Sequence, residues 1–282
     1  MFDIKVVNNE YQNSEKVIND LKKKFINAEP FPNIVIKNFF QDSFLDKILN
    51  DFPDLEKFNA SQKYNNQNEL KFANNKYDSF PESIKNLFDF LNSKKFLYFL
   101  QEISSVKETL ISDSQLNGGG LHEIKRGGIL KIHTDFNKHP TKDLDRRINL
   151  LLYLNKNWND KYGGHLELWD KNMKKCVKKI KPDFNTMVIF NTNDFSNHGH
   201  PDPLNCPNNI SRKSIATYYF SDGRPASEIN DNVYKNKTYF KNRSGHYNEV
   251  SRENEKFKNF LRSFKFYQKL KSFEKKYLRK KK

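Results

Sequence analysis

The chain has 282 residues, of which 36% are hydrophobic and 30% charged, and its 25 Phe and 13 Tyr supply apolar volume that a disordered chain lacks. We therefore expect a soluble globular protein. The N-terminus lacks a secretory signal and no apolar run is long enough to cross a bilayer, so the expected compartment is the cytoplasm. Two cysteines, Cys176 and Cys206, are too few for a disulfide framework or a thiolate zinc site.

The formal net charge of +16 lies mainly at the C-terminal end of the sequence. Residues 251–282 hold 13 Lys and Arg against 3 Glu, a net of +10, which leaves +6 for the first 250 residues. Phe257, Phe260, Leu261 and Phe264 recur at helical spacing among these lysines, which predicts a basic amphipathic helix. Such a helix can bind an anionic surface, or it can pack its apolar stripe on the protein and leave its lysines in solvent.

The first part of the chain favours helices with one short strand between them. Residues 14–28 place apolar side chains at helical spacing, and the run Ile-Val-Ile at 34–36 reads as a buried strand. Asp42 or Ser43 is the expected cap of a second helix.

The middle of the chain changes character at Gly118. Before it, residues 53–79 are polar and Asn-rich and are expected to form a long loop, and residues 81–110 fit two helices that break near Ser93. After it come short strand-forming runs separated by turn residues, which indicate a β-sandwich or barrel. The runs are GGILKIHTD, RINLLLYLN, GGHLELWD, a Lys-rich run ending in VKKIKP, TMVIFNT and RKSIATYYF.

Metal chemistry is indicated by His133 and Asp135, which stand two residues apart on a predicted strand and therefore leave the same face of it. A third ligand can come from His198 or His200, shortly after the apolar run TMVIFNT. Two imidazoles and one carboxylate form a facial triad, which leaves neighbouring positions open on non-haem iron(II). An isolated His-x-Asp pair is common in soluble proteins, so this pair alone does not establish a metal site.

The order of the motifs carries more weight than the pair alone. His-x-Asp is followed by YLNKNW, a Gly-Gly pair, a hydrophobic strand, HGH and RKSIATYYF, each in a β context. From residue 121 to residue 220 the chain resembles the prolyl-hydroxylase-like branch of the 2-oxoglutarate and iron(II) dependent oxygenases. FPNIVIKNFF resembles the N-terminal strand and helix of that branch.

The resemblance implies an α+β fold with a double-stranded β-helix, or jelly roll, as its core. Residues 1–117 would be an N-terminal helical support region of the same unit, residues 118–225 the jelly-roll oxygenase core, and residues 226–282 a C-terminal extension with the basic helix. Helices of the N-terminal region would pack on the core.

The resemblance also implies roles for individual residues. His133, Asp135 and His198 would be the catalytic iron(II) ligands, the third placed in a loop after the hydrophobic strand, with His200 as the alternative third ligand. Arg212 would bind the distal carboxylate of 2-oxoglutarate, because a guanidinium donates two parallel hydrogen bonds to a carboxylate. Lys213 would point to the opposite face of the strand.

Further polar residues are weaker candidates. Tyr153 would place its hydroxyl on the same carboxylate as Arg212, and Thr217 is a candidate for another hydroxyl there. His122 and Arg146 stand where related enzymes have substrate-facing residues, although ordinary surface positions explain them equally well. The Gly163–Gly164 pair is expected to form a turn between strands, without a chemical role.

The expected function is hydroxylation of an unidentified substrate by an iron(II) and 2-oxoglutarate dependent dioxygenase that consumes dioxygen, releases succinate and carbon dioxide, and is supported by ascorbate. A prolyl or other peptidyl residue and a small metabolite are both candidate substrates. The alternative is a non-catalytic jelly-roll module whose basic C-terminal helix contacts an anionic membrane, nucleic acid or an acidic partner. Turnover of 2-oxoglutarate to succinate separates the two hypotheses.

Overall fold

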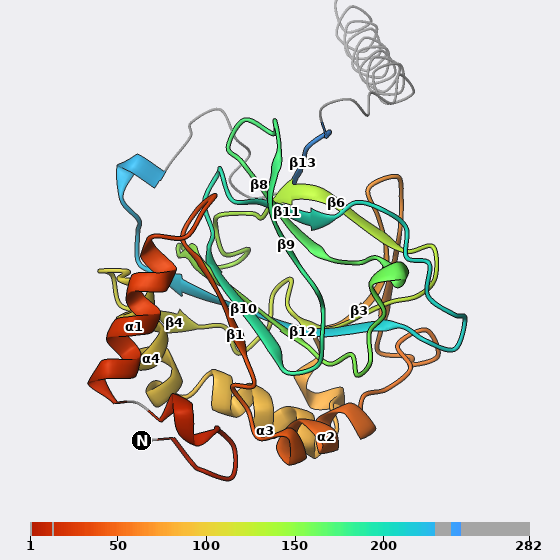
Figure 1. Cartoon of the computed structure of the whole chain (residues 1–282), viewed down its shortest axis with the longest axis horizontal. Coiled ribbons are helices and arrows are strands. Elements are labelled where there is room, and N and C mark those ends of the chain that lie inside the picture. The colour runs from red at the N-terminus through yellow and green to blue at the C-terminus, as the bar shows by residue number, and fades with distance from the viewer. Residues whose placement is uncertain (1, 13, 229–237, 244–282) are drawn as a thin grey trace, which may run out of the picture. The chain divides into compact units, whose positions relative to one another are not determined.

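The computed structural model describes residues 2–12, 14–228 and 238–243 (Figure 1). The predicted basic helix in residues 251–282 lies outside these ranges. Residues 1–242 form one compact unit. Among the described helices, none combines the length and the apolar character that a membrane crossing requires.

The helices lie in the first part of the chain, as the apolar spacing predicts. The α-helices are α1 (Glu15–Ile26), α2 (Asp42–Asn50), α3 (Glu82–Leu91) and α4 (Lys94–Ser104), and the 3-10 turns are Asn9–Tyr11, Tyr77–Ser79, Asp160–Tyr162 and Ala226–Glu228. The break near Ser93 is confirmed, because its Oγ accepts a hydrogen bond from the backbone N–H of Phe96 (3.2 Å) and so caps α4.

The expected cap of the second helix is wrong. Helix α2 begins at Asp42 itself, with Gln41 as the residue before it, and Gln41 makes no capping hydrogen bond with its side chain. The Asp42 carboxylate instead accepts a hydrogen bond from the side-chain amide of Asn185 (2.9 Å), which ties α2 to the sheet. The Asp42 side chain therefore contacts the sheet, whereas the sequence pattern predicts that it caps the helix.

The strands join into one antiparallel, nearly closed, barrel-like sheet, which is typical of the double-stranded β-helix, and with the helices this makes the fold α+β. The order along the sheet is β1-β10-β7-β12-β5-β3-β6-β11-β8-β9, with β2 paired to β3, β4 to β12 and β13 to β6. The strands are β1 (Asn33–Lys37), β2 (Gln62–Asn65), β3 (Glu69–Asn74), β4 (Ile111–Ser112), β5 (Gly120–Ile124), β6 (Ile129–Thr134), β7 (Asp145–Tyr153), β8 (Leu166–Trp169), β9 (Cys176–Ile180), β10 (Thr186–Asn191), β11 (Asn197–His200), β12 (Arg212–Ser221) and β13 (Tyr239–Phe240).

The segment 53–79 is not the long loop that its composition predicts. It contains the hairpin of β2 and β3, and β3 pairs with both β5 and β6. Pairing with two neighbouring strands offsets the low strand propensity of an Asn-rich segment, because propensity in a sheet depends on the surroundings of each strand. The hairpin brings Tyr64, Glu69 and Lys71 to the pocket described below.

The two ends of the sheet order, β1 and β9, lie close enough to be bridged by side chains. Lys178 on β9 donates a hydrogen bond to the side-chain oxygen of Asn33 on β1 (2.8 Å). Ile180 on β9 belongs to the same buried cluster as Val188 and Phe190 on β10. These contacts close the barrel without a continuous ladder of backbone hydrogen bonds.

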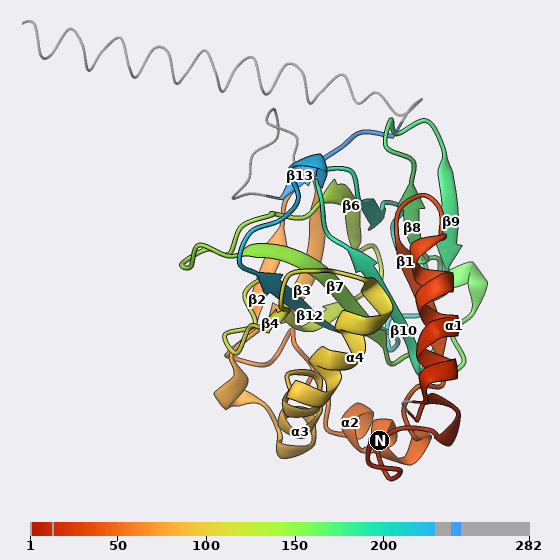
Figure 2. The ribbon, with the colours of Figure 1, turned by 90° about the vertical axis from the view of Figure 1, so that its left-hand side faces the viewer.

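Strand β7 shows how the sheet separates its two faces. Ile148, Leu150 and Leu152 point to the large hydrophobic core that the sheet shares with the helices, which gather beside it in Figure 2. Asn149 and Tyr153 alternate with them and line the pocket. The helices therefore cover the outer face, while the inner face is free to carry polar side chains.

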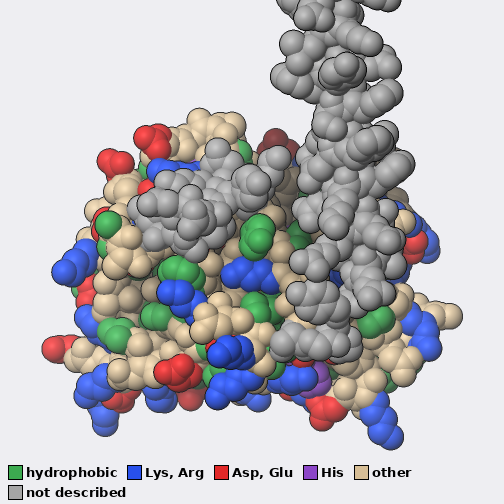
Figure 3. Space-filling view, turned by 90° about the horizontal axis from the view of Figure 1, so that it is seen from above, with side chains coloured by type: hydrophobic (Ala, Val, Ile, Leu, Met, Phe, Trp, Pro, Cys, Tyr) green, Lys and Arg blue, Asp and Glu red, His purple; other side chains and the backbone are tan. Residues whose placement is uncertain are grey.

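The surface in Figure 3 carries Lys and Arg side chains spread among polar and hydrophobic ones. On the part of this face that is drawn in colour they do not gather into a single basic patch.

Candidate active site

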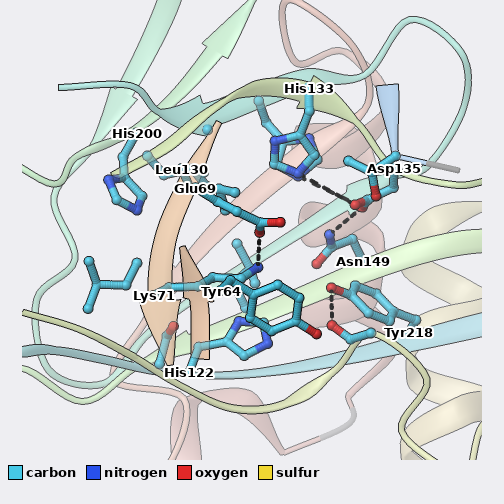
Figure 4. A pocket seen from close by; sticks show the side chains of 18 of the residues that line it. Tyr64, Glu69, Lys71, His122, Leu130, His133, Asp135, Asn149, His200 and Tyr218 are labelled. Carbon is cyan, nitrogen blue, oxygen red and sulfur yellow. Dashed lines mark hydrogen bonds and ion pairs between the residues drawn. The ribbon is translucent and has the colours of Figure 1, made fainter. Parts of the chain in front are cut away.

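A pocket inside the barrel collects polar side chains from strands that are far apart in the sequence (Figure 4). Strands β3, β5, β6, β7, β11 and β12 all contribute to its lining. Aliphatic side chains of Ile124, Leu130 and Leu166 lie between the polar ones. The pocket therefore combines a few directed polar groups with apolar walls, as small-molecule sites commonly do.

His133, Asp135 and His198 converge in this pocket. His133 is the pairing partner of His198 across β6 and β11, so the two rings lie side by side with centroids 4.4 Å apart. The Nε2 atom of His133 lies 3.7 Å from Oδ1 of Asp135, and that of His198 lies 3.8 Å from Oδ2. All three side chains are buried.

The distal histidine does not lie in the loop that the resemblance implies. Residues Asn197–His200 form the short strand β11, which pairs with β6 on one side and β8 on the other. His200 is not part of the cluster, and neither of its ring nitrogens has a hydrogen-bond partner among the described residues. The structure thus brings His198, and not His200, to His133 and Asp135.

The cluster fits a divalent transition metal. One ligand atom from each of His133, Asp135 and His198 lies within 4.8 Å of the others. The Nδ1 atom of His133 contacts the Lys131 carbonyl (2.8 Å) and that of His198 contacts the Ser196 carbonyl (2.9 Å). A carbonyl accepts only from a protonated Nδ1, so each Nε2 is left with its lone pair facing the cluster.

The electrostatics keep the carboxylate charged and the imidazole of His198 neutral. Burial raises the pKa of Asp135, but Arg146, His198 and His133 outweigh it and hold the pKa well below its usual range. Asn149 donates a hydrogen bond to Oδ2 of Asp135 (2.8 Å), which orients the carboxylate. Burial and the neighbouring His133 lower the pKa of His198 to about 4. These are the protonation states that metal ligation requires.

Arg212 occupies another part of the pocket and is held by groups that carry no charge. Its Nε donates to the carbonyl of Gly164 (2.8 Å) and its Nη2 donates to the hydroxyl of Tyr153 (3.1 Å). No ion pair joins Arg212 to a carboxylate of the described residues. Its side chain is buried, and its hydrogen-bond partners in the described part of the chain are all neutral.

Gly164 is shaped for this contact. Its φ is +72°, and a Cβ added to it would lie 2.6 Å from Cδ2 of Leu204 and 3.0 Å from Cδ of Arg212. Both glycines lie in the connection between the 3-10 turn Asp160–Tyr162 and β8. This connection presents the carbonyl of Gly164 to the guanidinium.

The alternation of β12 separates the predicted residues. Lys213 points to the opposite face and pairs with Glu123 (3.5 Å), as predicted. Thr217 does not belong to the pocket: it lies on the same side of β12 as Lys213, whereas Ser214 and Tyr218 line the pocket with Arg212. The suggestion that Thr217 supplies a hydroxyl is therefore wrong, and Ser214 is the hydroxyl on that face of the strand.

His122 and Arg146 both line the pocket, so neither is an ordinary surface residue. His122 is the pairing partner of Ser214 on β12. Burial, together with the positive charges of Lys71 and Arg212, lowers the pKa of His122 to about 3. Its position could have been inferred only from the pairing of β5 with β12, which the sequence does not specify.

Comparisons with known proteins agree with this geometry. Residues 119–220 match the family model described as the 2OG-Fe(II) oxygenase superfamily. A search of the curated proteins found no match to this sequence.

Solved structures share the fold at low sequence identity. A prolyl-4-hydroxylase from Pseudomonas putida is 12% identical, with 73% of this chain and 100% of that chain covered and a TM-score of 0.53. A prolyl hydroxylase from Trichoplax adhaerens, solved with a peptide fragment of the hypoxia inducible factor oxygen degradation domain, is 18% identical, with coverages of 73% and 90% and a TM-score of 0.53. A prolyl 4-hydroxylase from Phytophthora capsici is 19% identical, with coverages of 77% and 68% and a TM-score of 0.50.

The family match spans His133, Asp135, His198 and Arg212, and the buried triad has the donor atoms that the family's iron requires. Residues 119–220 are therefore a 2OG-Fe(II) oxygenase core, with the iron ligands and Arg212 inside the matched part of the chain.

Proposed function

We propose that the pocket holds iron(II) on His133, Asp135 and His198, binds 2-oxoglutarate through Arg212 and Tyr153, and hydroxylates a substrate that enters the same pocket. The observation that carries the proposal is the meeting of three buried ligands in one pocket with a buried arginine whose hydrogen-bond partners, within the described ranges, are neutral. The antiparallel barrel and the prolyl hydroxylase structures that share it support a jelly-roll core of the prolyl-hydroxylase-like branch.

When bound, iron(II) and 2-oxoglutarate supply the activation of dioxygen, which couples decarboxylation of the co-substrate to succinate with oxidation of a C–H bond. The contribution of the protein is to hold the reacting groups in place and to exclude water. His133 and His198 are fixed by their Nδ1 contacts, and Asn149 fixes Asp135. Each ligand is thus oriented by a second group before any metal binds.

Arg212 is suited to the distal carboxylate of the co-substrate. Its contacts with Gly164 and Tyr153 fix the plane of the guanidinium, so the remaining N–H groups are directed before the ligand arrives. A carboxylate that meets them forms charge-assisted hydrogen bonds, which are about twice as strong as neutral ones. Tyr153 can donate its own hydroxyl proton to the same carboxylate, because that oxygen accepts from Arg212.

The choice of substrate is a separate matter from the oxidation chemistry. Three of the structures that share the fold are prolyl hydroxylases and another is a carbocyclase of nogalamycin biosynthesis, which makes a prolyl or other peptidyl residue one candidate substrate and a small metabolite another. The pocket is lined by Lys71, Glu69 and Tyr64 of the β2–β3 hairpin, a segment outside the matched residues 119–220. Selectivity can therefore arise from a part of the chain that the family pattern does not cover.

The test is formation of succinate from 2-oxoglutarate by purified protein with iron(II), ascorbate and dioxygen. Enzymes of this kind turn over 2-oxoglutarate slowly even without a substrate, so the wild-type protein should form succinate. Asp135→Ala should form none and should also fail to bind iron. Failure of the wild-type protein both to bind iron and to form succinate overturns the proposal and leaves the non-catalytic module.

A further inference from the structure

Arg146 is a second buried arginine in the pocket, and its guanidinium has unused donors. Its side chain is 0% exposed, and Nε, Nη1 and Nη2 all lack a hydrogen-bond partner among the described residues. Its contact with a charged group is an ion pair of Nη1 with Oδ2 of Asp135 at 3.2 Å. Buried N–H groups are satisfied in the great majority of native proteins, so these donors call for an explanation.

The chain builds this position with a β-bulge. Phe220 pairs with Arg146 and Tyr219 pairs with Ile148, so Arg147 is an extra residue in β7. Without the bulge, Arg146 would share the outer face of the strand with Ile148. The bulge turns Arg146 into the pocket, a common use of bulges beside active sites.

Two aromatic rings hold the guanidinium from above and below. Its Cζ lies 3.5 Å from the ring centroid of Phe136 and 3.6 Å from that of Tyr218. The hydroxyl of Tyr218 donates to the carbonyl of Gly118 (3.1 Å), which fixes that ring. Because both faces of the guanidinium are covered, a ligand can reach it only at its edges, where the N–H groups point.

Gly118 leaves space at one of these edges. A Cβ added to Gly118 would lie 3.2 Å from Nη2 of Arg146 and 3.1 Å from Cε1 of Phe136. Any other residue would therefore crowd the position beside Nη2 that a hydrogen-bond acceptor would use.

The charges in the pocket favour an anion there. Apart from the imidazoles, the lining has three cations, Lys71, Arg146 and Arg212, against two anions, Glu69 and Asp135. Lys71 is paired with Glu69 at 3.1 Å. The two positive charges of iron(II) cancel the two negative charges of 2-oxoglutarate, so one positive charge remains when both are bound. Arg212 would face the co-substrate and Asp135 would face the metal, so the remaining positive charge is that of Arg146.

We propose that Arg146 binds a carboxylate of the primary substrate, which places the substrate among carboxylate-bearing molecules. This inference rests on the proposed function, since it assumes that Arg212 takes the co-substrate. The carboxylate can belong to a free amino acid or similar small acid, or to an acidic side chain of a peptide. In both cases the planar guanidinium edge and its unused donors recognise the same chemical group.

The experiment compares carboxylates with their primary amides, which have nearly the same shape but no charge. Protein loaded with Mn(II) and saturating 2-oxoglutarate, without dioxygen, is titrated in a calorimeter with L-amino acids and with the corresponding amino acid amides. A second arm uses blocked proline-containing dipeptides in which Asp is exchanged for Asn. Formation of succinate by the wild-type protein without substrate is measured first, so that a failure of the proposed function is recognised separately.

At least one acid should bind wild-type protein more than about tenfold more tightly than its amide, as expected for a charge-assisted pair in a buried site. Arg146→Gln should abolish this preference, and Arg146→Lys should retain part of it because the charge remains without the fork. Arg126→Gln, the same change at an arginine outside the pocket that donates to the Cys206 carbonyl, should keep the preference.

The arm in which the preference appears identifies the source of the carboxylate. If wild-type protein forms succinate but binds acids and amides equally, or binds neither, the inference is overturned. A preference that survives in Arg146→Gln overturns it as well. Should Arg146→Gln fail to fold, the wild-type comparison and Arg146→Lys decide the matter, because a site that only orients Asp135 predicts no preference for acids.

Discussion

Arg212 and Arg146 are buried in the same pocket, yet different kinds of contact hold their guanidinium groups in place. Arg212 has no carboxylate partner among the described residues, but it is held by hydrogen bonds to Gly164 and Tyr153. Arg146 has a carboxylate beside it, but its side chain is held by the rings of Phe136 and Tyr218, and its guanidinium forms no hydrogen bond among the described residues.

The difference shows two ways in which a barrel can prepare a cation for a ligand. Hydrogen bonds fix the plane of Arg212 and use some of its donors, which suits a ligand of constant shape such as a co-substrate. Aromatic stacking fixes the plane of Arg146 and leaves its donors free. The metal ligands lie nearer to Arg146, because Asp135 is shared between that arginine and the two histidines.

The largest expected effect concerns which histidine completes the metal site. His198→Ala should lower iron(II) affinity by more than about 100-fold, because it removes a ligand, where the loss of outer-shell partners alone costs about 10–100-fold. His200→Ala is the matched change two residues away and should bind iron(II) with nearly wild-type affinity, since His200 lies outside the cluster. Calorimetric titration with a divalent metal measures both. If only His200→Ala lost metal binding, the third ligand would be His200 and the metal would lie nearer to Arg212, which would contradict the assignment.

The next effect separates the two arginines. Arg212→Gln should raise the dissociation constant of 2-oxoglutarate by about 30-fold or more, because losing one partner of a buried charged pair costs about 2–5 kcal/mol. Arg146→Gln should raise it by less, since Arg146 is assigned to another ligand. Binding is measured on the Mn(II) protein without dioxygen. The reverse order of the two effects would exchange the roles of the arginines.

A smaller effect is expected at the turn that supports Arg212. Gly163 and Gly164 both have a φ of +72°, so alanine at either position brings strain of about 1–3 kcal/mol. An added Cβ meets Leu204 and Arg212 only at Gly164, whereas at Gly163 the nearest atom, the carbonyl oxygen of Pro203, is 4.0 Å away. Gly164→Ala should therefore weaken 2-oxoglutarate binding more than Gly163→Ala does. Equal binding by the two variants would mean that Gly164 does not position Arg212.

The last effect concerns the pH dependence of stability and does not involve the binding of a ligand. Burial and the cations Lys71 and Arg212 lower the pKa of His122 from 6.5 to about 3, so the imidazole stays neutral in the folded protein while the unfolded chain takes up a proton. The free energy of unfolding therefore decreases as the pH falls from about 6.5 toward 3, by at most about 1.4 kcal/mol per pH unit for this group. In metal-free His122→Gln, urea unfolding should show a shallower slope over this range. A slope equal to that of the wild-type protein would place the imidazole away from these cations.

The parts of this site that follow from alternation along one strand could be predicted from the sequence. His133 with Asp135, and Arg212 as opposed to Lys213, need only the two-residue period of a strand. The expectation that Thr217 shares the pocket with Arg212 contradicts this two-residue period, and the structure shows that it is wrong.

The remaining parts depend on tertiary pairing. Arg146 faces the pocket because Arg147 is an extra residue, a bulge, in β7. The sequence does not reveal this bulge, because the apolar residues from Ile148 onward follow the alternation of a regular strand. The hairpin of β2 and β3 forms because β5 and β6 offer it two neighbours, although its composition is that of a loop. The family match over residues 119–220 confirms the prediction of a 2-oxoglutarate oxygenase core. The sequence allowed this prediction because it rested on the order of several motifs.

The central claim is that a single site joins the metal to 2-oxoglutarate. Its most direct test is a titration of 2-oxoglutarate into iron(II)-loaded protein without dioxygen, followed by the visible charge-transfer absorption that iron(II) shows when 2-oxoglutarate chelates it. We expect the absorption to appear and to saturate in the wild-type protein, and to be absent in Asp135→Ala. A wild-type protein that binds no iron(II), or that binds it without developing this absorption, would contradict the claim.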